Sequence, residues 1–307
     1  MAFTFGLQRM SQIILSQYDS NERADVYQRL LQDTDWRKEA SGVFPWLCDR
    51  LSSNLQPDTL VGDFGCGTGR LLPLLCADRR QVLGVDFSRE MLRRVVVPAE
   101  SLPSEFFLDV VTAQAVTEAL GLRRHVFAAA ALEELLPELG KAGVRVDAAI
   151  NSFNSVCFSH PAIPIGAIAR CLKPGGVLYF ASNVFHPREL VVPATEPFYF
   201  DLFADLSTPY SLNLTGLMFR HLVNTPAGPV PFQDYVHTLE MVRCAFSAEE
   251  WQVREAILFP GYEADISTDP ATEHLFPSSS DVQLLERDNE FAFCKIGILA
   301  VRRDEIV

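Results

Sequence analysis

Short apolar runs alternate with helical patterns along the first part of the chain. Apolar residues recur at three- and four-residue spacing over residues 11–51, which predicts helices there. Further along, the apolar runs are brief and end at glycines or polar residues, which is typical of buried strands. The predicted strands span residues 60–64, 81–85, 125–129, 147–150 and 177–181.

Helical patterns lie between these strands. Ser88 precedes the apolar residues Met91 and Leu92, as an N-cap does. Residues 173–176, Lys-Pro-Gly-Gly, end the last helix. Strands that alternate with helices in this way predict an α/β fold with a doubly wound, mostly parallel sheet. The predicted helices span residues 70–76, 88–95, 108–120 and 163–172.

The pattern changes after residue 183. Two apolar segments, 217–223 and 233–242, flank a turn region and predict an antiparallel hairpin. Ser247 and Glu250 have the spacing of a capping box, so we predict a helix that starts there and leads to a strand at residues 257–259. Residues 291–301 predict the last strand, which brings the sheet to seven strands.

These patterns divide the chain into three regions. We predict a helical N-terminal cover over residues 1–55 and an inserted antiparallel lid or substrate lobe over residues 185–245. Residues 56–184 and 246–307 would together form the sheet domain.

The first candidate site is the segment Asp63-x-Gly65-x-Gly67-x-Gly69, which follows the first predicted strand. Glycines allow a sharp turn and a close approach of backbone amides to a ligand. The next helix adds its positive N-terminal end. Ligands of doubly wound sheets bind at the carboxyl ends of the strands, where Asp63 lies. A carboxylate there suits an ammonium group.

The second candidate site is Asp86-Phe87, at the end of the second predicted strand. An acidic residue there can accept hydrogen bonds from both hydroxyls of a ribose. Dinucleotide dehydrogenases use the same position, but their loop has GxGxxG spacing and binds a pyrophosphate. Here the spacing is GxGxG, and the carboxylate of Asp63 would repel a pyrophosphate. The sequence therefore disfavours NAD.

Composition and net charge limit the classes of partner that we expect for the protein. The chain has 307 residues and a formal net charge of −13, which makes nucleic acid and anionic membranes improbable partners. Its seven cysteines show no metal-ligand spacing, so we expect no metal site. The N-terminus lacks the pattern of a signal peptide, and no apolar run is long enough to span a bilayer. We expect a cytoplasmic protein; homo-oligomerisation is left open.

Three motifs in order resemble the signature of class I S-adenosylmethionine-dependent methyltransferases. They are residues 63–69, residues 85–88 with Met91 and Leu92, and residues 172–176. The resemblance covers residues 60–181 and the terminal strand. It implies a Rossmann-like methyltransferase fold with S-adenosyl-L-methionine as the cofactor. The Phe-Asn-Ser sequence after the fourth strand and the inserted hairpin resemble the small-molecule methyltransferases, with a layout similar to relatives of glycine N-methyltransferase.

The resemblance also implies roles for individual residues. The glycine loop would surround the methionyl part, Asp86 would bind the ribose and Phe87 would flank the adenine. Where the family often has a third-strand carboxylate for the adenine amino group, this chain has alanine, so backbone groups at Ala131 and Leu132 would replace it. The expected cofactor-binding residues are Tyr18, Asp63, Gly65, Cys66, Gly67, Asp86, Phe87, Met91, Ala131, Leu132, Asn151, Ser152 and Asn154.

The expected reaction is methyl transfer to an oxygen or nitrogen of a small organic acceptor. His160 and His186 follow the fourth and fifth predicted strands, so either is a candidate general base. Two alternatives remain open at this point: a non-catalytic cofactor-binding or regulatory protein of the same fold, and an NAD-dependent oxidoreductase.

Overall fold

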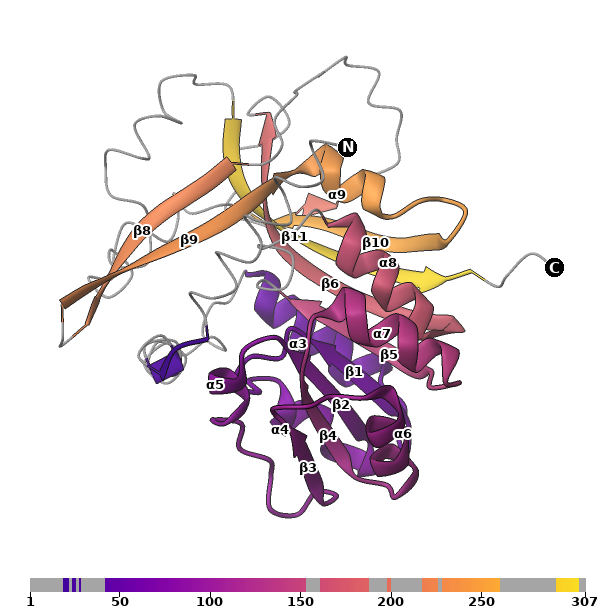
Figure 1. Ribbon diagram of the computed structural model, residues 1–307. Helices are drawn as coiled ribbons and strands as arrows, with labels where there is room; N and C mark the ends of the chain where they lie inside the picture. Colours follow the sequence, from indigo (N-terminus) through magenta and orange to yellow (C-terminus); the bar gives the residue numbers. More distant parts are fainter. Residues whose placement is uncertain are drawn as a thin grey trace, which may run out of the picture.

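A computed structural model of the protein describes residues 19–21, 24, 25, 28, 42–152, 161–187, 198–199, 217–225, 228–259 and 291–303 (Figure 1). Within these residues, eleven strands form one sheet. The main strand order is β3-β4-β2-β1-β5-β6-β11-β10-β7, and β9 joins the sheet through β6 and pairs with β8. The doubly wound, mostly parallel sheet is confirmed, with eleven strands rather than seven.

The parallel half of the sheet contains the strands that the apolar runs predicted. Its central strand is β1, which pairs in parallel with β2 on one side and β5 on the other. Every residue of β2 is buried, as expected for a strand that helices cover on both faces. The parallel strands are β1 (Leu60–Phe64), β2 (Gln81–Asp86), β3 (Ser104–Phe107), β4 (His125–Ala129), β5 (Val146–Ser152) and the start of β6 (Leu172–Pro187).

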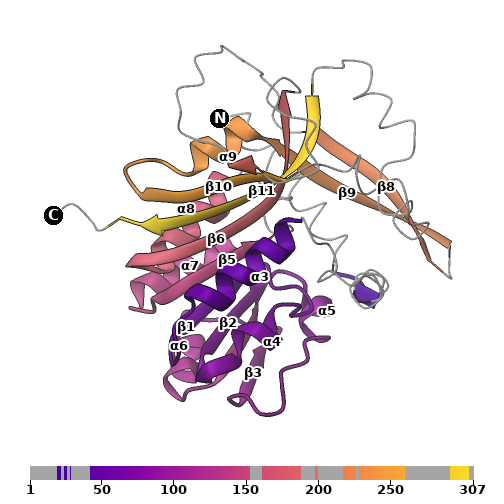
Figure 2. The ribbon, with the colours of Figure 1, turned by 180° about the vertical axis from the view of Figure 1, so that it is seen from behind.

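Helices cover both faces of this sheet. Figure 1 shows α6, α7 and α8 in front of the strands, and Figure 2 shows α3 and α4 on the opposite face. Each layer has its own apolar core, with Leu135 and Ile168 in one and Leu47 and Leu72 in the other. The helices are α3 (Val43–Asn54), α4 (Leu72–Leu75), α5 (Arg89–Leu92), α6 (Ala113–Gly121), α7 (Leu132–Lys141), α8 (Ala162–Cys171) and α9 (Leu239–Ala245).

The antiparallel half begins with a long ladder between β6 and β11 (Phe291–Arg302), which runs from Val177↔Val301 to Pro187↔Phe291. The next strands are β10 (Trp251–Phe259) and β7 (Phe198–Tyr199). The predicted hairpin is present as β8 (Leu217–Thr225) and β9 (Gly228–Thr238). Because β9 pairs with the end of β6 through Val184↔His237 and Phe185↔Thr238, the hairpin is joined to the sheet.

Helix α3 is fastened across the sheet to β10. The indole Nε1 of Trp46 donates to Glu255 Oε1 at 2.9 Å. Arg50 donates to both carboxylate oxygens of Glu255, also at 2.9 Å. A side chain on Gly297 would collide with the Trp46 ring, because its Cβ would lie 2.6 Å from Cζ3. Glycine at this position of β11 therefore permits the close approach of the helix.

The predicted helix from Ser247 is wrong. Residues 251–259 form strand β10, and the helix lies earlier, at Leu239–Ala245. Buried Leu239, Val242 and Phe246 have helical spacing, which the prediction of a strand up to residue 242 missed. Ser247 instead closes a turn, since its carbonyl oxygen accepts from the amide of Trp251 at 2.9 Å.

Two elements near the sheet edge also differ from the prediction. Residues 108–112 are not helical; α6 starts at Ala113, where the Thr112 hydroxyl accepts from the amide of Ala115 at 3.2 Å. Strand β3 was not predicted, because Ser-Glu-Phe-Phe is too short to show a period. It lies at the sheet edge beside β4, with Phe106 stacked on Phe127.

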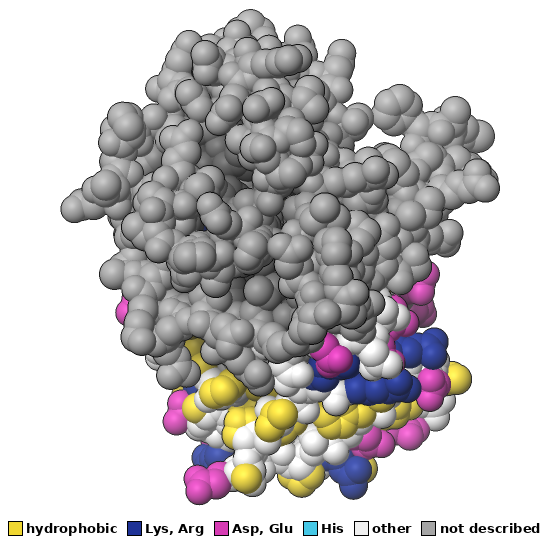
Figure 3. All heavy atoms as spheres, turned by 90° about the vertical axis from the view of Figure 1, so that its left-hand side faces the viewer, with side chains coloured by type: hydrophobic (Ala, Val, Ile, Leu, Met, Phe, Trp, Pro, Cys, Tyr) yellow, Lys and Arg dark blue, Asp and Glu magenta, His cyan; other side chains and the backbone are white. Residues whose placement is uncertain are grey.

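The outer surface of the described part mixes charges. On the face shown in Figure 3, acidic, basic and hydrophobic side chains are interspersed over the described atoms. Among the residues that the structure describes, no helix has both the length and the apolar character needed to cross a membrane.

Candidate functional site

The loop after β1 is a glycine turn that other residues could adopt only with strain. Gly65, Gly67 and Gly69 have φ values of +83°, +54° and +82°. The amide of Gly65 donates to the Val85 carbonyl at 2.7 Å, and that of Gly69 to the Cys66 carbonyl at 2.9 Å. The loop is thereby held against the end of β2. This arrangement confirms the turn that the glycine spacing predicted.

Asp86 fixes the same loop from the end of β2. Its Oδ2 accepts from the amide of Gly67 at 2.8 Å, and its Oδ1 accepts from the amide of Ser88 at 2.9 Å. A carboxylate oxygen has more than one acceptor site, so both oxygens can still accept from a ligand hydroxyl. Burial raises the pKa of Asp86 from 3.8 to about 6, although the two amides oppose the shift. Asp86 is thus both part of the loop and a candidate ligand.

Asp63 lies on β1 at the mouth of the loop and is 2 % exposed. It lines a pocket whose other lining residues are Gly65, Cys66, Thr68, Arg70, Leu71 and Ser152. Burial raises the pKa of Asp63 to about 7, against the attraction of Arg70 and with a smaller contribution from Asp86. The pocket therefore contains a buried carboxyl group that a cationic ligand would favour in its charged form.

The end of β5 completes the pocket. Ser152 lines it beside Asp63. The preceding residue, Asn151, is fully buried, and its Nδ2 donates to the Phe64 carbonyl at 3.0 Å. Asn151 thereby ties the end of β5 to the end of β1, which is a structural contribution that the sequence did not reveal.

The predicted adenine side of the site lies around the end of β4. The amide of Ala130 donates to the Asp86 carbonyl at 3.0 Å, so the segment that ends in Ala131 and Leu132 lies next to Asp86. Met91 is buried, and its amide donates to the Ser88 hydroxyl at 3.2 Å, which confirms Ser88 as the N-cap. The predicted residues of this side therefore do come together.

Phe87 and Cys66 complete the predicted set within the described residues. Phe87 is half-buried in the turn between β2 and α5. The side chain of Cys66 is buried, and a Cβ on Gly84 would lie only 3.1 Å from its Sγ. Burial raises the pKa of the Cys66 thiol well above its usual value. Cys66 therefore packs as a neutral thiol.

Four predicted residues have no described side chain. Tyr18, Asn154 and His160 lie outside the described residues. His186 belongs to β6, where it pairs with Ala292, and only its backbone is described. Within the described part of the chain, no group of three His, Cys, Asp or Glu side chains could hold a metal ion.

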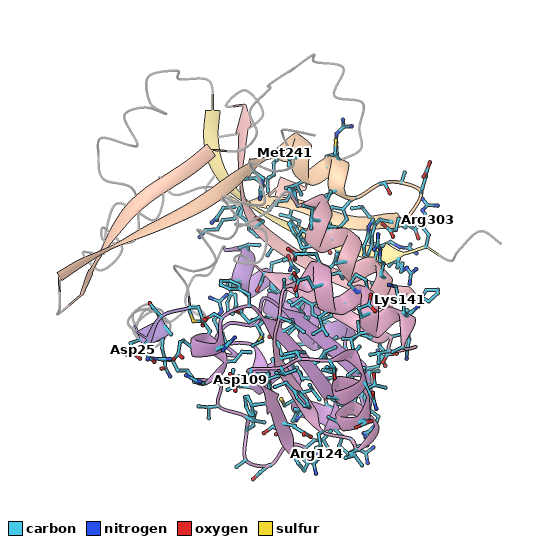
Figure 4. The ribbon with its side chains drawn as sticks, in the orientation of Figure 1. Asp25, Asp109, Arg124, Lys141, Met241 and Arg303 are labelled. Carbon is cyan, nitrogen blue, oxygen red and sulfur yellow. The ribbon has the colours of Figure 1, made fainter. Side chains whose placement is uncertain are left out.

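Two residues near the site were missed by the sequence analysis. Arg70 follows the third glycine directly, and this position was the available signal. Asp19, next to predicted Tyr18, lies at the start of α5, where its Oδ1 accepts from the amide of Glu90 at 3.3 Å. Asp25 pairs with Arg94 at 2.5 Å, and Figure 4 shows it beside α5. Residues before α3 thus contact the element that follows Asp86.

Comparisons with known proteins agree with this geometry. Residues 62–180 match the family model described as a methyltransferase domain. This range includes the glycine loop, Asp63, Asp86 and Ser152. A search of curated proteins gave no match.

Solved structures with a similar fold include the cyclase SpnF, which is 14 % identical, with 96 % of this chain and 97 % of that chain covered and a TM-score of 0.52. Geranyl diphosphate C-methyltransferase from Streptomyces coelicolor A3(2) is 16 % identical over 84 % and 77 % of the two chains, with a TM-score of 0.47. An S-adenosylmethionine-dependent methyltransferase from Clostridium acetobutylicum ATCC 824 is 16 % identical over 92 % and 99 %, with a TM-score of 0.44. At these identities, the likeness to the cyclase supports the fold alone.

The range that matches the family model covers the described pocket. The matched range begins one residue before Asp63 and includes the left-handed glycines and both buried carboxylates. The chain therefore carries a class I S-adenosylmethionine-dependent methyltransferase domain.

Proposed function

We propose that the protein transfers the methyl group of S-adenosylmethionine to an oxygen or nitrogen of a small organic acceptor by in-line displacement. The observation that carries this proposal is the pair of buried carboxylates, Asp63 and Asp86, on either side of a loop of left-handed glycines. The net charge of −13 supports a small acceptor over a nucleic acid.

The residues present fit the cofactor. Asp63 would hold the methionyl ammonium, and the glycines leave room for the ligand against the backbone. Asp86 would accept from the ribose hydroxyls, and backbone groups at Ala131 and Leu132 would meet the adenine beside Phe87. When bound, S-adenosylmethionine supplies a methyl group that is already activated on a sulfonium.

The chain's own contribution to transfer is alignment and exclusion of water. We propose that Asn151, Ser152 and Asn154, at and after the end of β5, face the reacting methyl group. The hairpin β8–β9 and α5 lie on the same side of the molecule in Figures 1 and 2, which supports a covering role for the hairpin. Tyr18, just before Asp19, would line the same side.

A hydroxyl acceptor would need a general base, whereas a neutral amine would need one less. We propose His160, which comes after β5, or His186, near the carboxyl end of β6, for this role. If one of them removes the proton, its alanine variant loses turnover with a hydroxyl acceptor but still binds S-adenosylhomocysteine. The pH–rate profile of that variant should also lack the limb that the imidazole gives the wild-type protein.

The first test is calorimetric titration of the protein with S-adenosylhomocysteine. Asp86→Ala should abolish binding because it removes a ligand acceptor and the acceptor of the Gly67 amide. Asp109→Ala is the matched control, because this carboxylate is 78 % exposed and pairs with Arg89 on α5. Unchanged binding by the Asp86 variant would refute the assigned cofactor site.

The second test is a screen of small hydroxyl and amine compounds with S-adenosylmethionine, followed by mass spectrometry of the products. Methylated product supports the proposal and identifies the acceptor atom. Binding of S-adenosylhomocysteine without product from any acceptor class would favour a non-catalytic protein of this fold. A fluorescence titration with NADH separates the oxidoreductase alternative, for which we expect no binding.

A further inference from the structure

Arg70 places a positive charge in the same pocket as Asp63. It follows the last glycine of the loop, and the pocket that it lines also includes Ser152. Its attraction partly offsets the effect of burial on the pKa of Asp63, so the two side chains lie close enough to interact electrostatically. The pocket is thus lined by one acidic and one basic side chain.

The guanidinium of Arg70 is held by an aromatic ring. Its Cζ lies 4.3 Å from the centroid of Phe44, within the range of a cation–π interaction. Phe44 is 6 % exposed and belongs to α3. Because Trp46 and Arg50 fasten α3 to Glu255 of β10, the ring has a fixed position. The helix before the methyltransferase domain therefore positions a charge inside the pocket.

The two charges match the amino-acid end of the cofactor, which carries an ammonium and a carboxylate on the same carbon atom. We propose that Arg70 is the receptor for the methionyl carboxylate, opposite Asp63 as the receptor for the ammonium, and that Phe44 is the positioning residue for Arg70. A guanidinium is suited to this task because its planar donors match the two oxygens of a carboxylate. The inference rests on S-adenosylmethionine as the cofactor.

This pairing has a consequence for ligand choice. A nucleoside that lacks the amino-acid part leaves both charges of the pocket without their partners, and it should bind weakly. A ligand that keeps the ammonium and lacks only the carboxylate isolates the contribution of Arg70. Three ligands therefore separate the two charges: S-adenosylhomocysteine, its decarboxylated form, and 5′-methylthioadenosine.

The experiment is calorimetry of these three ligands with the wild-type protein, Arg70→Ala and Asp63→Asn. Arg70→Ala should lower the affinity for S-adenosylhomocysteine by about tenfold to a hundredfold, which is the range for loss of a hydrogen bond to a charged group. The same variant should change the affinity for the other two ligands by less than about threefold. Asp63→Asn should instead weaken both ligands that carry the ammonium. Arg124→Ala is the control, because this arginine is exposed and pairs with Glu105 at the opposite edge of the sheet.

Each alternative result has a defined meaning. If Arg70→Ala weakens all three ligands equally, the residue supports the pocket structurally and the inference is wrong. If it changes none of them, the arginine does not contact the cofactor, which also overturns the inference. If the wild-type protein binds none of the three ligands, the proposed function itself fails.

Phe44 is tested in the same titrations. Phe44→Leu keeps an apolar residue in the core and removes the ring under Arg70. It should lower the affinity for S-adenosylhomocysteine by a smaller factor than Arg70→Ala and leave the decarboxylated ligand unchanged. In the double variant Phe44→Leu/Arg70→Ala, the effect of Phe44 on S-adenosylhomocysteine should disappear, since its target is absent. Purely additive effects would refute the positioning role.

Discussion

Asp63 and Asp86 are both buried carboxyl groups whose pKa values lie near neutrality, at about 7 and about 6. Desolvation is the main cause for both residues, because charge is costly where water is excluded. The hydrogen bonds from Gly67 and Ser88 keep the pKa of Asp86 lower than it would otherwise be. Asp63 is therefore the first of the two to take up a proton as the pH falls.

Affinity for the cofactor should depend on pH for this reason. The ligand ammonium favours the ionised form of Asp63, so binding below pH 7 requires loss of the proton that the free protein has gained. We expect the affinity for S-adenosylhomocysteine to be higher at pH 8 than at lower pH and to fall as the pH drops below 7. The decline should approach about tenfold per pH unit and steepen below pH 6, where Asp86 is also protonated.

Calorimetry in buffers of different ionisation enthalpy checks this expectation between pH 5.5 and 8.5, because it counts the protons released on binding. The Asp63→Asn variant should bind S-adenosylhomocysteine weakly, and its affinity should not change with pH near pH 7. A wild-type affinity that does not change between pH 8 and pH 6 would contradict the assignment of Asp63.

Local spacing predicted the residues at the strand ends well. Asp63, the three glycines and Asp86 are fixed by short-range geometry, because a turn and two strand ends determine where they lie. Arg70 was missed because it looked like the first residue of an ordinary helix. Its role depends on Phe44, which is distant in sequence, and no local pattern reveals such a contact.

Among the elements, β10 is one whose local sequence predicts a helix but whose structure is set by pairing with a distant strand. Ser247 and Glu250 have the spacing of a helix cap, but the residues that follow pair with β11 from Trp251↔Arg302 to Phe259↔Lys295. The hydrogen bonds of this ladder and the burial of residues 256–259 stabilise the strand. Predictions of β1, β2, β4 and β5 succeeded because those strands have strong apolar runs.

The attachment of α3 to β10 should contribute measurably to stability. Glu255→Ala removes the acceptor of both Trp46 and Arg50, whose donors are partly buried, so unfolding should become easier by about 2–3 kcal/mol. Asp49→Ala is the matched control, because Asp49 pairs with the same arginine but is 65 % exposed. Its effect should stay within about 0.5 kcal/mol. Urea unfolding measures both, and equal losses would contradict the importance of the buried partner.

Substitution by alanine at two different glycines should change the stability of the protein in opposite directions. Gly297→Ala on β11 forces the Trp46 ring away and should destabilise the protein by about 1–3 kcal/mol. Gly166 lies inside α8, and nothing lies within 4 Å of an added Cβ. Gly166→Ala should therefore stabilise the protein by up to about 1 kcal/mol, since alanine favours a helix. Thermal unfolding compares the two, and a shift in the same direction for both would refute the packing argument.

At the scale of the whole molecule, the cofactor loop and the hairpin belong to different parts of the sheet. The loop follows β1 in the parallel half, whereas β9 joins the far end of β6. The division into a sheet domain and an inserted lobe at residues 185–245 stays a prediction, since Leu239 and Val242 of α9 belong to the core of the sheet. Acceptor choice would then depend on the insertion, and cofactor binding would not.

Shortening the hairpin tests that division. Replacing residues 219–234 with an Asn-Gly turn removes most of the ladder between β8 and β9 and keeps the residues that pair with β6. We expect the affinity for S-adenosylhomocysteine to change by less than about threefold. Turnover with the acceptor found in the screen should fall at least about tenfold. Equal losses of binding and turnover would show that the two regions act as one unit.

The ladder between β6 and β11 has a mechanical consequence. Its pairs run without a break from Val177↔Val301 beneath the helices to Pro187↔Phe291 beyond the point where the hairpin joins. The hairpin is therefore attached to a continuous pair of antiparallel strands and not to a flexible loop. A displacement of the β9 residues that pair with Val184 and Phe185, relative to Asp63, would have to bend or twist this pair of strands. Such movement stores elastic energy, so the hairpin should return to its resting position once the load on it is released.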